Sequence, residues 1–151
     1  MDKNVAVLIA GGVLVTVLFL LFGRPGDIPK EGVFPRVEIG SVTVSVSIAD
    51  DETEREIGLS GVHALPEMSG KLFIFEERGT PAFWMKDMLF PIDIIWIDEG
   101  GRIVDITKFF APETYPASVS PVVPVRFVLE VNAGFVDKYN IEIGQLVNIK
   151  K

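Results

Sequence analysis

The run Ile92-Asp93-Ile94-Ile95-Trp96-Ile97 constrains the fold more than any other stretch of this 151-residue chain. β-Branched and aromatic residues in a short apolar run are typical of a buried strand. The run ends a longer apolar and aromatic segment, Ala82 to Ile97, which also contains Lys86 and Asp87. A charged group in an apolar setting is costly unless it is paired or hydrogen-bonded. Asp93 is therefore predicted to be either a structural pin or part of a site.

The chain begins with a candidate membrane segment, because Val5 to Phe22 form an uncharged apolar run. As a helix with a rise of about 1.5 Å per residue, this run is close in length to the roughly 30 Å hydrocarbon core of a bilayer. It is longer than the apolar core of a cleavable signal peptide, and it ends in Leu20-Leu21-Phe22-Gly23 rather than in a small-residue cleavage motif. We predict an uncleaved single-pass signal anchor over residues 1–23, with a cleavable signal peptide as the alternative.

The rest of the chain divides into a linker and one domain. Residues 24–33 are rich in Pro, Gly and charge and have no hydrophobic period, which is typical of a linker. Residues 34–151 are enough for one core and too few for two. The charges on either side of the anchor nearly balance, so the positive-inside rule favours neither orientation. The acidic domain with few basic residues favours a place outside the cytoplasm.

Composition excludes several kinds of chemistry. The chain has 14 basic and 21 acidic side chains, and this balance argues against a nucleic-acid partner. The absence of Cys excludes disulfides, thiolate nucleophiles and Cys-type zinc sites. No Walker-type loop or Gly-x-Ser-x-Gly turn occurs, and the only histidine, His63, is in a Gly- and Pro-rich loop without a nearby ligand set. We predict no metal site and no cofactor.

Hydrophobic periodicity predicts a mainly β domain. Period-two alternation and β-branched runs predict strands, Gly-rich turns predict hairpins, and an Asp followed by Glu residues predicts a short exposed helix. A second helix of little more than one turn is expected near the C-terminus. The expected strands are 36–39, 41–48, 71–75, 92–97, 103–110, 125–131 and a final strand ending at 149, and the expected helices lie within 49–59 and 135–139.

Several motifs resemble the DUF192 (UPF0127) family. They are Gly58-Leu59, Leu65-Pro66, the block Phe83 to Asp87, Pro91 to Ile94, and Leu129 to Gly134. Members usually carry Met at the position of Ser60, and usually Asn or a similar residue at that of Asp87. The resemblance covers about Val37 to Ile149 and implies a compact, mainly β domain with small helices, often behind a signal or membrane segment, in a family without an established activity. We expect an antiparallel, barrel-like β domain (α+β) with two short helices.

The leading hypothesis is that the domain binds a small polar ligand, either sugar-like or anionic. If Phe83 to Lys86 is extended, Trp84 and Lys86 share one face and present an aromatic ring beside a cation. Asp93 and Glu130 interrupt apolar strands, so both are expected to be buried and hydrogen-bonded. We expect one pocket bordered by Trp84, Lys86 and Asp93, with Glu130 beneath and the loop Ala111 to Pro124 as its rim. The candidate ligand-binding residues are Trp84, Lys86, Asp87, Asp93, Glu130 and Asn132.

Two alternatives stay open. The domain is a hydrolase if Asp87 or Asp93 acts with Glu130 as a general acid and base pair, because two carboxylates in different environments can have separated pKa values. It is a membrane-tethered adaptor if the Pro-rich loop 111–124 contacts another protein. Structural readings also remain for three residues, since Trp84 and Trp96 could both belong to the core and Lys86 could simply pair with a carboxylate.

Overall fold

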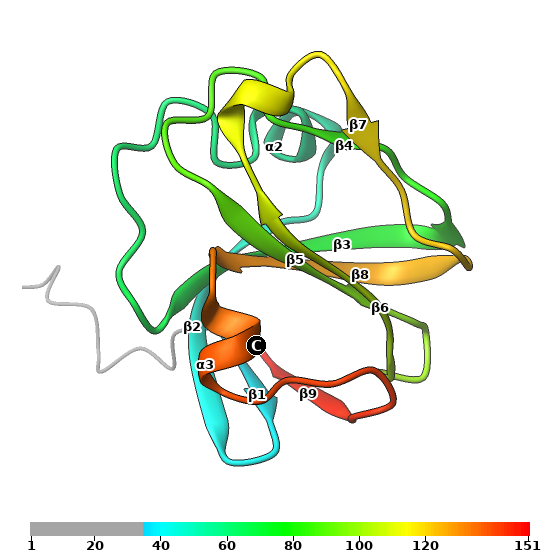
Figure 1. The fold of residues 1–151 in the computed structure, drawn as a ribbon. Coiled ribbons are helices and arrows are strands. Elements are labelled where there is room, and N and C mark those ends of the chain that lie inside the picture. The colour runs from blue at the N-terminus through cyan, green and yellow to red at the C-terminus, as the bar shows by residue number, and fades with distance from the viewer. Residues whose placement is uncertain (1–34) are drawn as a thin grey trace, which may run out of the picture. The chain divides into compact units, whose positions relative to one another are not determined.

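The computed structural model describes residues 35–151, and Figure 1 shows their arrangement. The predicted anchor, including Val5 to Phe22, and the predicted linker lie outside the described residues. Among residues 35–151, no helix has the length and apolar character needed to cross a membrane.

One seven-stranded sheet organises the described residues, in the spatial order β6-β5-β8-β3-β2-β1-β9. Strand β5, between the edge strand β6 and β8, is the predicted run Ile92–Ile97, and all of its residues are buried. A separate two-stranded sheet pairs β4 with β7. The strands are β1 (Arg36–Ile39), β2 (Val42–Ala49), β3 (Ser69–Gly79), β4 (Phe83–Trp84), β5 (Ile92–Ile97), β6 (Ile103–Phe110), β7 (Ser118–Val119), β8 (Val125–Asn132) and β9 (Val147–Lys150).

The expectation of a wholly antiparallel domain is corrected at one pair, because β2 and β3 are parallel. A parallel pair needs a long crossover, usually with a helix, since a tight turn can join only antiparallel neighbours. The segment between β2 and β3 provides this crossover through helix α2 (Glu52–Ile57) and the loop that follows it. The remaining strand pairs are antiparallel, as in the hairpins β1–β2 and β5–β6.

The sheet curls so far that its two edges meet. The amide N–H of Ile103 at the start of β6 donates to the carbonyl of Gln145 (3.0 Å), and that of Val147 in β9 donates to the carbonyl of Gly101 (2.7 Å). Gly101 has a φ of +78°, and a Cβ there would lie 2.9 Å from the Val147 oxygen, so glycine is needed at this turn. The mainly β prediction with a barrel-like sheet and two short helices is thereby confirmed as a curled half-barrel.

Each face of the sheet carries its own core. The concave side is filled by a cluster that includes Ile95, Leu129 and Val131, and the short helix α3 (Phe135–Lys138) adds Phe135 and Val136 to it. The opposite side is filled by Phe73, Ile94, Trp96 and Val128, together with Met85 and Met88 from the loop after β4. Figure 1 shows α2, β4 and β7 over this second side. Odd-numbered residues of β5 therefore face α3, and even-numbered ones face the β4–β7 layer.

Helix α2 begins as its sequence predicts. Asp51 is the N-cap, and its Oδ1 accepts a hydrogen bond from the amide of Glu54 (2.7 Å), which satisfies one of the free amides of the first turn. The helix ends at Gly58, whose φ is +52°. No residue of α2 is buried, so the predicted short exposed helix is confirmed.

Candidate functional site

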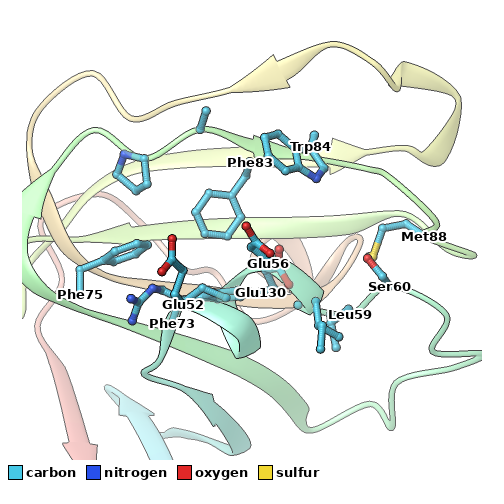
Figure 2. A pocket seen from close by; sticks show the side chains of 15 residues that line it. Glu52, Glu56, Leu59, Ser60, Phe73, Phe75, Phe83, Trp84, Met88 and Glu130 are labelled. Atoms are coloured by element: carbon cyan, nitrogen blue, oxygen red, sulfur yellow. The ribbon is translucent and has the colours of Figure 1, made fainter.

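A cavity of about 210 Å³ lies on the side of the sheet that β4 and α2 cover. Figure 2 shows its two walls, one from β4 with Phe83 and Trp84 and one from α2 with Glu52 and Glu56. Phe73 and Glu130 lie at the sheet. Further lining includes Arg55, Leu59, Ser60, Phe75 and Met88.

Glu130 is the buried acid of this cavity. Its side chain is 6% exposed, and its Oε2 has no hydrogen-bond partner among the described residues. Burial raises the pKa of Glu130 to about 8, and nearby Lys71 offsets only part of this effect. Lys71 is directly opposite Glu130 in the β3–β8 ladder. At neutral pH the cavity wall thus holds a mostly protonated carboxyl group, which can donate a hydrogen bond as well as accept one.

Trp84 and Phe83 have opposite roles in β4. Phe83 packs edge-to-face on Phe73 (centroids 4.9 Å apart) and on Trp96 (5.3 Å), which fixes its ring in the core. Trp84 is 51% exposed at the cavity and pairs with Ser118 of β7. The loop 111–124 therefore supports the strand that carries Trp84, but none of its residues lines the cavity.

Lys86 and Asp87 lie in a turn beyond β4 and outside the cavity lining. The predicted alternation does not reach Lys86, because the strand ends at Trp84 and the buried Met85 and Met88 turn the two residues between them toward solvent. Asp87 has a φ of +58°, a left-handed conformation that Asn and Asp tolerate better than most residues. Asp therefore suits the backbone conformation at this position.

The turn at residues 86 and 87 is also held by its backbone carbonyls. The hydroxyl of Ser60 donates to the carbonyl of Lys86 (2.9 Å), and the amide of Gly61 donates to that of Asp87 (2.8 Å). These bonds join the turn to the segment after α2. Lys86 and Asp87 thus contribute to the structure through their main chain while their side chains are exposed.

Asp93 is fully buried and acts as a structural pin. Its Oδ1 accepts from the amide of Phe109 (2.9 Å), at the bulge where two residues of β6 oppose Asp93 and Phe109 has a φ of +52°. Its Oδ2 accepts from the amide of Val136 (3.0 Å) in the first turn of α3. One carboxylate thereby fixes a bulge and caps a helix that are far apart in sequence.

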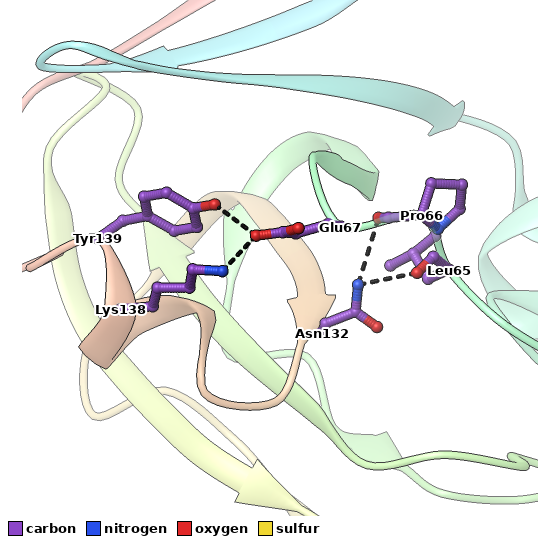
Figure 3. A network of polar contacts seen from close by, with 6 residues as sticks. All are labelled: Leu65, Pro66, Glu67, Asn132, Lys138 and Tyr139. Atoms are coloured by element: carbon purple, nitrogen blue, oxygen red, sulfur yellow. Dashed lines mark hydrogen bonds and ion pairs between the residues drawn. The ribbon is translucent and has the colours of Figure 1, made fainter.

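Asn132 and Glu67 hold the loop before β3 (Figure 3). The amide nitrogen Nδ2 of Asn132 donates to the carbonyls of Leu65 (2.9 Å) and Pro66 (3.2 Å). Glu67 accepts hydrogen bonds from Lys138 and from the hydroxyl of Tyr139 (2.9 Å). The Lys138 bond, followed by that of Tyr139, lowers the pKa of Glu67. Asn132 therefore serves as a latch between β8 and this loop.

The structure thus brings two of the six candidate residues, Trp84 and Glu130, to one cavity. Asp93 lies on the α3 side of the sheet, so the single pocket expected for Trp84, Lys86 and Asp93 is not formed. The expected burial is observed for both Asp93 and Glu130, whereas Oε2 of Glu130 lacks the expected partner. Trp96 is fully buried and donates through Nε1 to Thr107 (3.0 Å), which confirms its core role.

Sequence reasoning missed the contribution of α2 to the cavity. The sequence predicts only a short exposed helix here, whereas Glu52 and Glu56 of that helix line a wall of the cavity. Their four-residue spacing on the same helical face was the available signal. Among residues 35–151, no group of three or more His, Asp or Glu side chains is arranged to hold a metal ion.

Fold and cavity together define a small half-barrel domain with an aromatic, acid-lined cavity. The chain belongs to the DUF192 family, described as "Uncharacterized ACR", whose model matches residues 36–149. A search of the curated proteins finds no match.

Solved structures share this fold, including the following two. One is described as a "putative transcription regulator" from Sinorhizobium meliloti 1021, with 30% identity and a TM-score of 0.71 over 76% of this chain and 91% of that one. The other is a protein of unknown function from Novosphingobium aromaticivorans DSM 12444, with 25% identity and a TM-score of 0.71 over 80% of this chain and 89% of that one. These neighbours support the fold.

Proposed function

We propose that the domain binds a small polar ligand in the cavity between Trp84 and Glu130. The observation that carries this proposal is the unpartnered Oε2 of a nearly buried carboxyl group that lines an accessible cavity. A buried polar atom without a partner costs about 1–3 kcal/mol. A ligand group that bonds to Oε2 would recover much of this free energy. The exposed ring of Trp84 supplies apolar contact area at the same place.

The size and charge of the cavity restrict the ligand. Its volume of about 210 Å³ is below the roughly 300–1,000 Å³ of pockets for drug-sized ligands, which favours a compound of one ring or less. Three carboxyl groups and one guanidinium line it. This excess of acids disfavours the anionic ligand among the two classes expected from the sequence. Uncharged polar compounds, including sugar-like ones, and cations remain.

The contacts of the carboxylates do not favour the hydrolase alternative. Asp93 and Glu130 lie on opposite faces of the sheet, and both oxygens of Asp93 already accept backbone hydrogen bonds. Asp87 is outside the cavity lining. The acidic composition likewise argues against a nucleic-acid partner for this chain.

A thermal-shift screen of the full-length protein against small sugars, polyols, amines and carboxylic acids tests the proposal. We expect some polar compounds to raise the melting temperature of the wild type, and the effect to be lost in Trp84→Ala. Ile143→Ala is the matched control, because Ile143 is exposed and lies outside the cavity lining. The proposal fails if no compound stabilises the wild type, or if Trp84→Ala responds as Ile143→Ala does.

The membrane part of the proposal is that Val5 to Phe22 anchors the domain outside the cytoplasm as an uncleaved helix. It is supported by the length of the apolar run and by the lack of a small-residue cleavage motif. Protease added to intact cells should remove the domain while cytoplasmic proteins stay intact. Full protection of the domain contradicts the orientation, and a mature N-terminus beyond Phe22 contradicts the anchor.

A further inference from the structure

The charges around the cavity are unbalanced. Glu52 and Glu56 of α2 and Glu130 of β8 line it, and none of the three is in an ion pair with another of residues 35–151. The one lining cation, Arg55, donates to the carbonyls of Asp50 (2.7 Å) and Ile74 (3.0 Å). The guanidinium of Arg55 is thus held by the main chain, and the cavity is lined by more carboxyl groups than cations.

Aromatic rings supply the rest of the recognition surface. Four of them line the cavity, and Arg55 already lies over the ring of Phe75, with its guanidinium carbon 5.3 Å from the centroid. The faces of aromatic rings attract cations, and indole does so most strongly. The half-exposed ring of Trp84 has a surface free for such a contact, whereas Phe83 is fixed between Phe73 and Trp96.

We propose that the cavity binds a small organic cation, a primary or quaternary ammonium, with its charge between the ring of Trp84 and the carboxyl group of Glu130. This inference rests on the proposed function and names its ligand class. The acidic residues of α2 are not the only support for this inference. The independent observation is Glu130, which is 6% exposed and lines the cavity with an unpartnered oxygen.

Proton linkage gives the inference a signature that a neutral ligand lacks. A cation beside Glu130 favours its ionised form and so lowers the pKa of this carboxyl group, which burial raises to about 8. Binding near pH 7 therefore releases a proton, and affinity rises with pH. The other charged groups that face Glu130 are Glu52, Arg55 and Glu56 from α2 and Lys71 from β3. The affinity for the cation increases by up to about tenfold per pH unit below pH 8 and levels off above pH 8.

Calorimetric titration of the full-length protein with choline tests this proposal. The comparison ligands are the uncharged analogue with carbon in place of the quaternary nitrogen, and glucose. We expect choline to bind about tenfold or more tightly than its analogue, with a proton released at pH 7 and an affinity that rises between pH 6 and 8. Glu130→Gln should abolish the pH dependence, and Trp84→Ala should weaken binding about tenfold.

Two exposed carboxylates provide a test that is independent of burial. Glu56→Gln on the cavity wall should weaken choline binding, and Glu142→Gln on the distant surface should leave it unchanged. If glucose binds while choline binds no better than its neutral analogue, the cation inference is overturned and the proposed ligand site stands. If no compound binds in the calorimetric titrations and none stabilises the protein in the thermal-shift screen, the cation inference and the proposed ligand site both fail.

Discussion

Replacing Glu130 with Gln will make the protein more stable above pH 8, on the order of 3 kcal/mol in the free energy of unfolding. Burial raises the pKa of Glu130 from 4.5 to about 8, so the folded state keeps a proton that the unfolded state releases between these values. The stability of the wild type therefore falls as pH rises from about 4.5 through 8. Gln has the same shape and does not ionise, so the variant lacks this loss.

Urea unfolding of both proteins at pH 5, 7 and 9 measures the effect. The two should have similar stability at pH 5, and the variant should gain progressively at pH 7 and 9. Glu142→Gln serves as the control, because Glu142 is exposed. Parallel pH profiles for wild type and Glu130→Gln would show that Glu130 is ionised in the folded protein without penalty, and the description of the cavity would be wrong.

Replacing Asp93 with Ala should lower the free energy of unfolding on the order of 3 kcal/mol or more. The change leaves the buried amide of Val136 and the part-buried amide of Phe109 without their acceptor, and a buried donor without a partner costs about 1–3 kcal/mol. Phe109 has in addition a left-handed conformation that its neighbours must hold. Loss of the Asp93 carboxylate removes one of the groups that hold Phe109 in this conformation.

Chemical denaturation gives the size of this loss, with Asp50→Ala as the comparison because Asp50 is exposed. A change within about 0.5 kcal/mol is expected for Asp50→Ala. Amide hydrogen exchange at Val136 and Phe109 should increase selectively in Asp93→Ala. If the stability of Asp93→Ala matches that of Asp50→Ala, Asp93 does not pin the bulge and α3.

Local patterns predicted the elements of this fold well, because their causes are local. The β-branched run of β5, the Gly100-Gly101 turn and the Asp51 cap each act within a few residues. The parallel pairing of β2 with β3 was missed, since it depends on where the crossover through α2 lies in space. The meeting of the sheet edges at Gly101 and Val147 was likewise outside the reach of local patterns.

The site was predictable only in part for the same reason. Glu130 interrupts an apolar strand, and that signal identified it as a buried acid. Asp93 gave the same signal, yet its hydrogen-bond partners are the backbone amides of Phe109 and Val136. No sequence pattern indicates that these two residues lie near Asp93. Trp84 and Lys86 were expected on one face, and the early end of β4 separates them. Two similar sequence signals thus led to a structural pin on one face of the sheet and a candidate site on the other.

The two tryptophans allow one measurement that tests the ligand site most directly. Trp84 is at the cavity, whereas Trp96 is buried and bonded to Thr107, so their indole N–H resonances report on ligand contact and on the core. The full-length protein, labelled with ¹⁵N on its indoles, is titrated with the compound that stabilises it most. We predict that the Trp84 resonance shifts with ligand concentration, that the Trp96 resonance stays in place, and that Glu130→Gln alters the titration. A stabilising compound that leaves the Trp84 resonance unmoved would contradict a ligand site between Trp84 and Glu130.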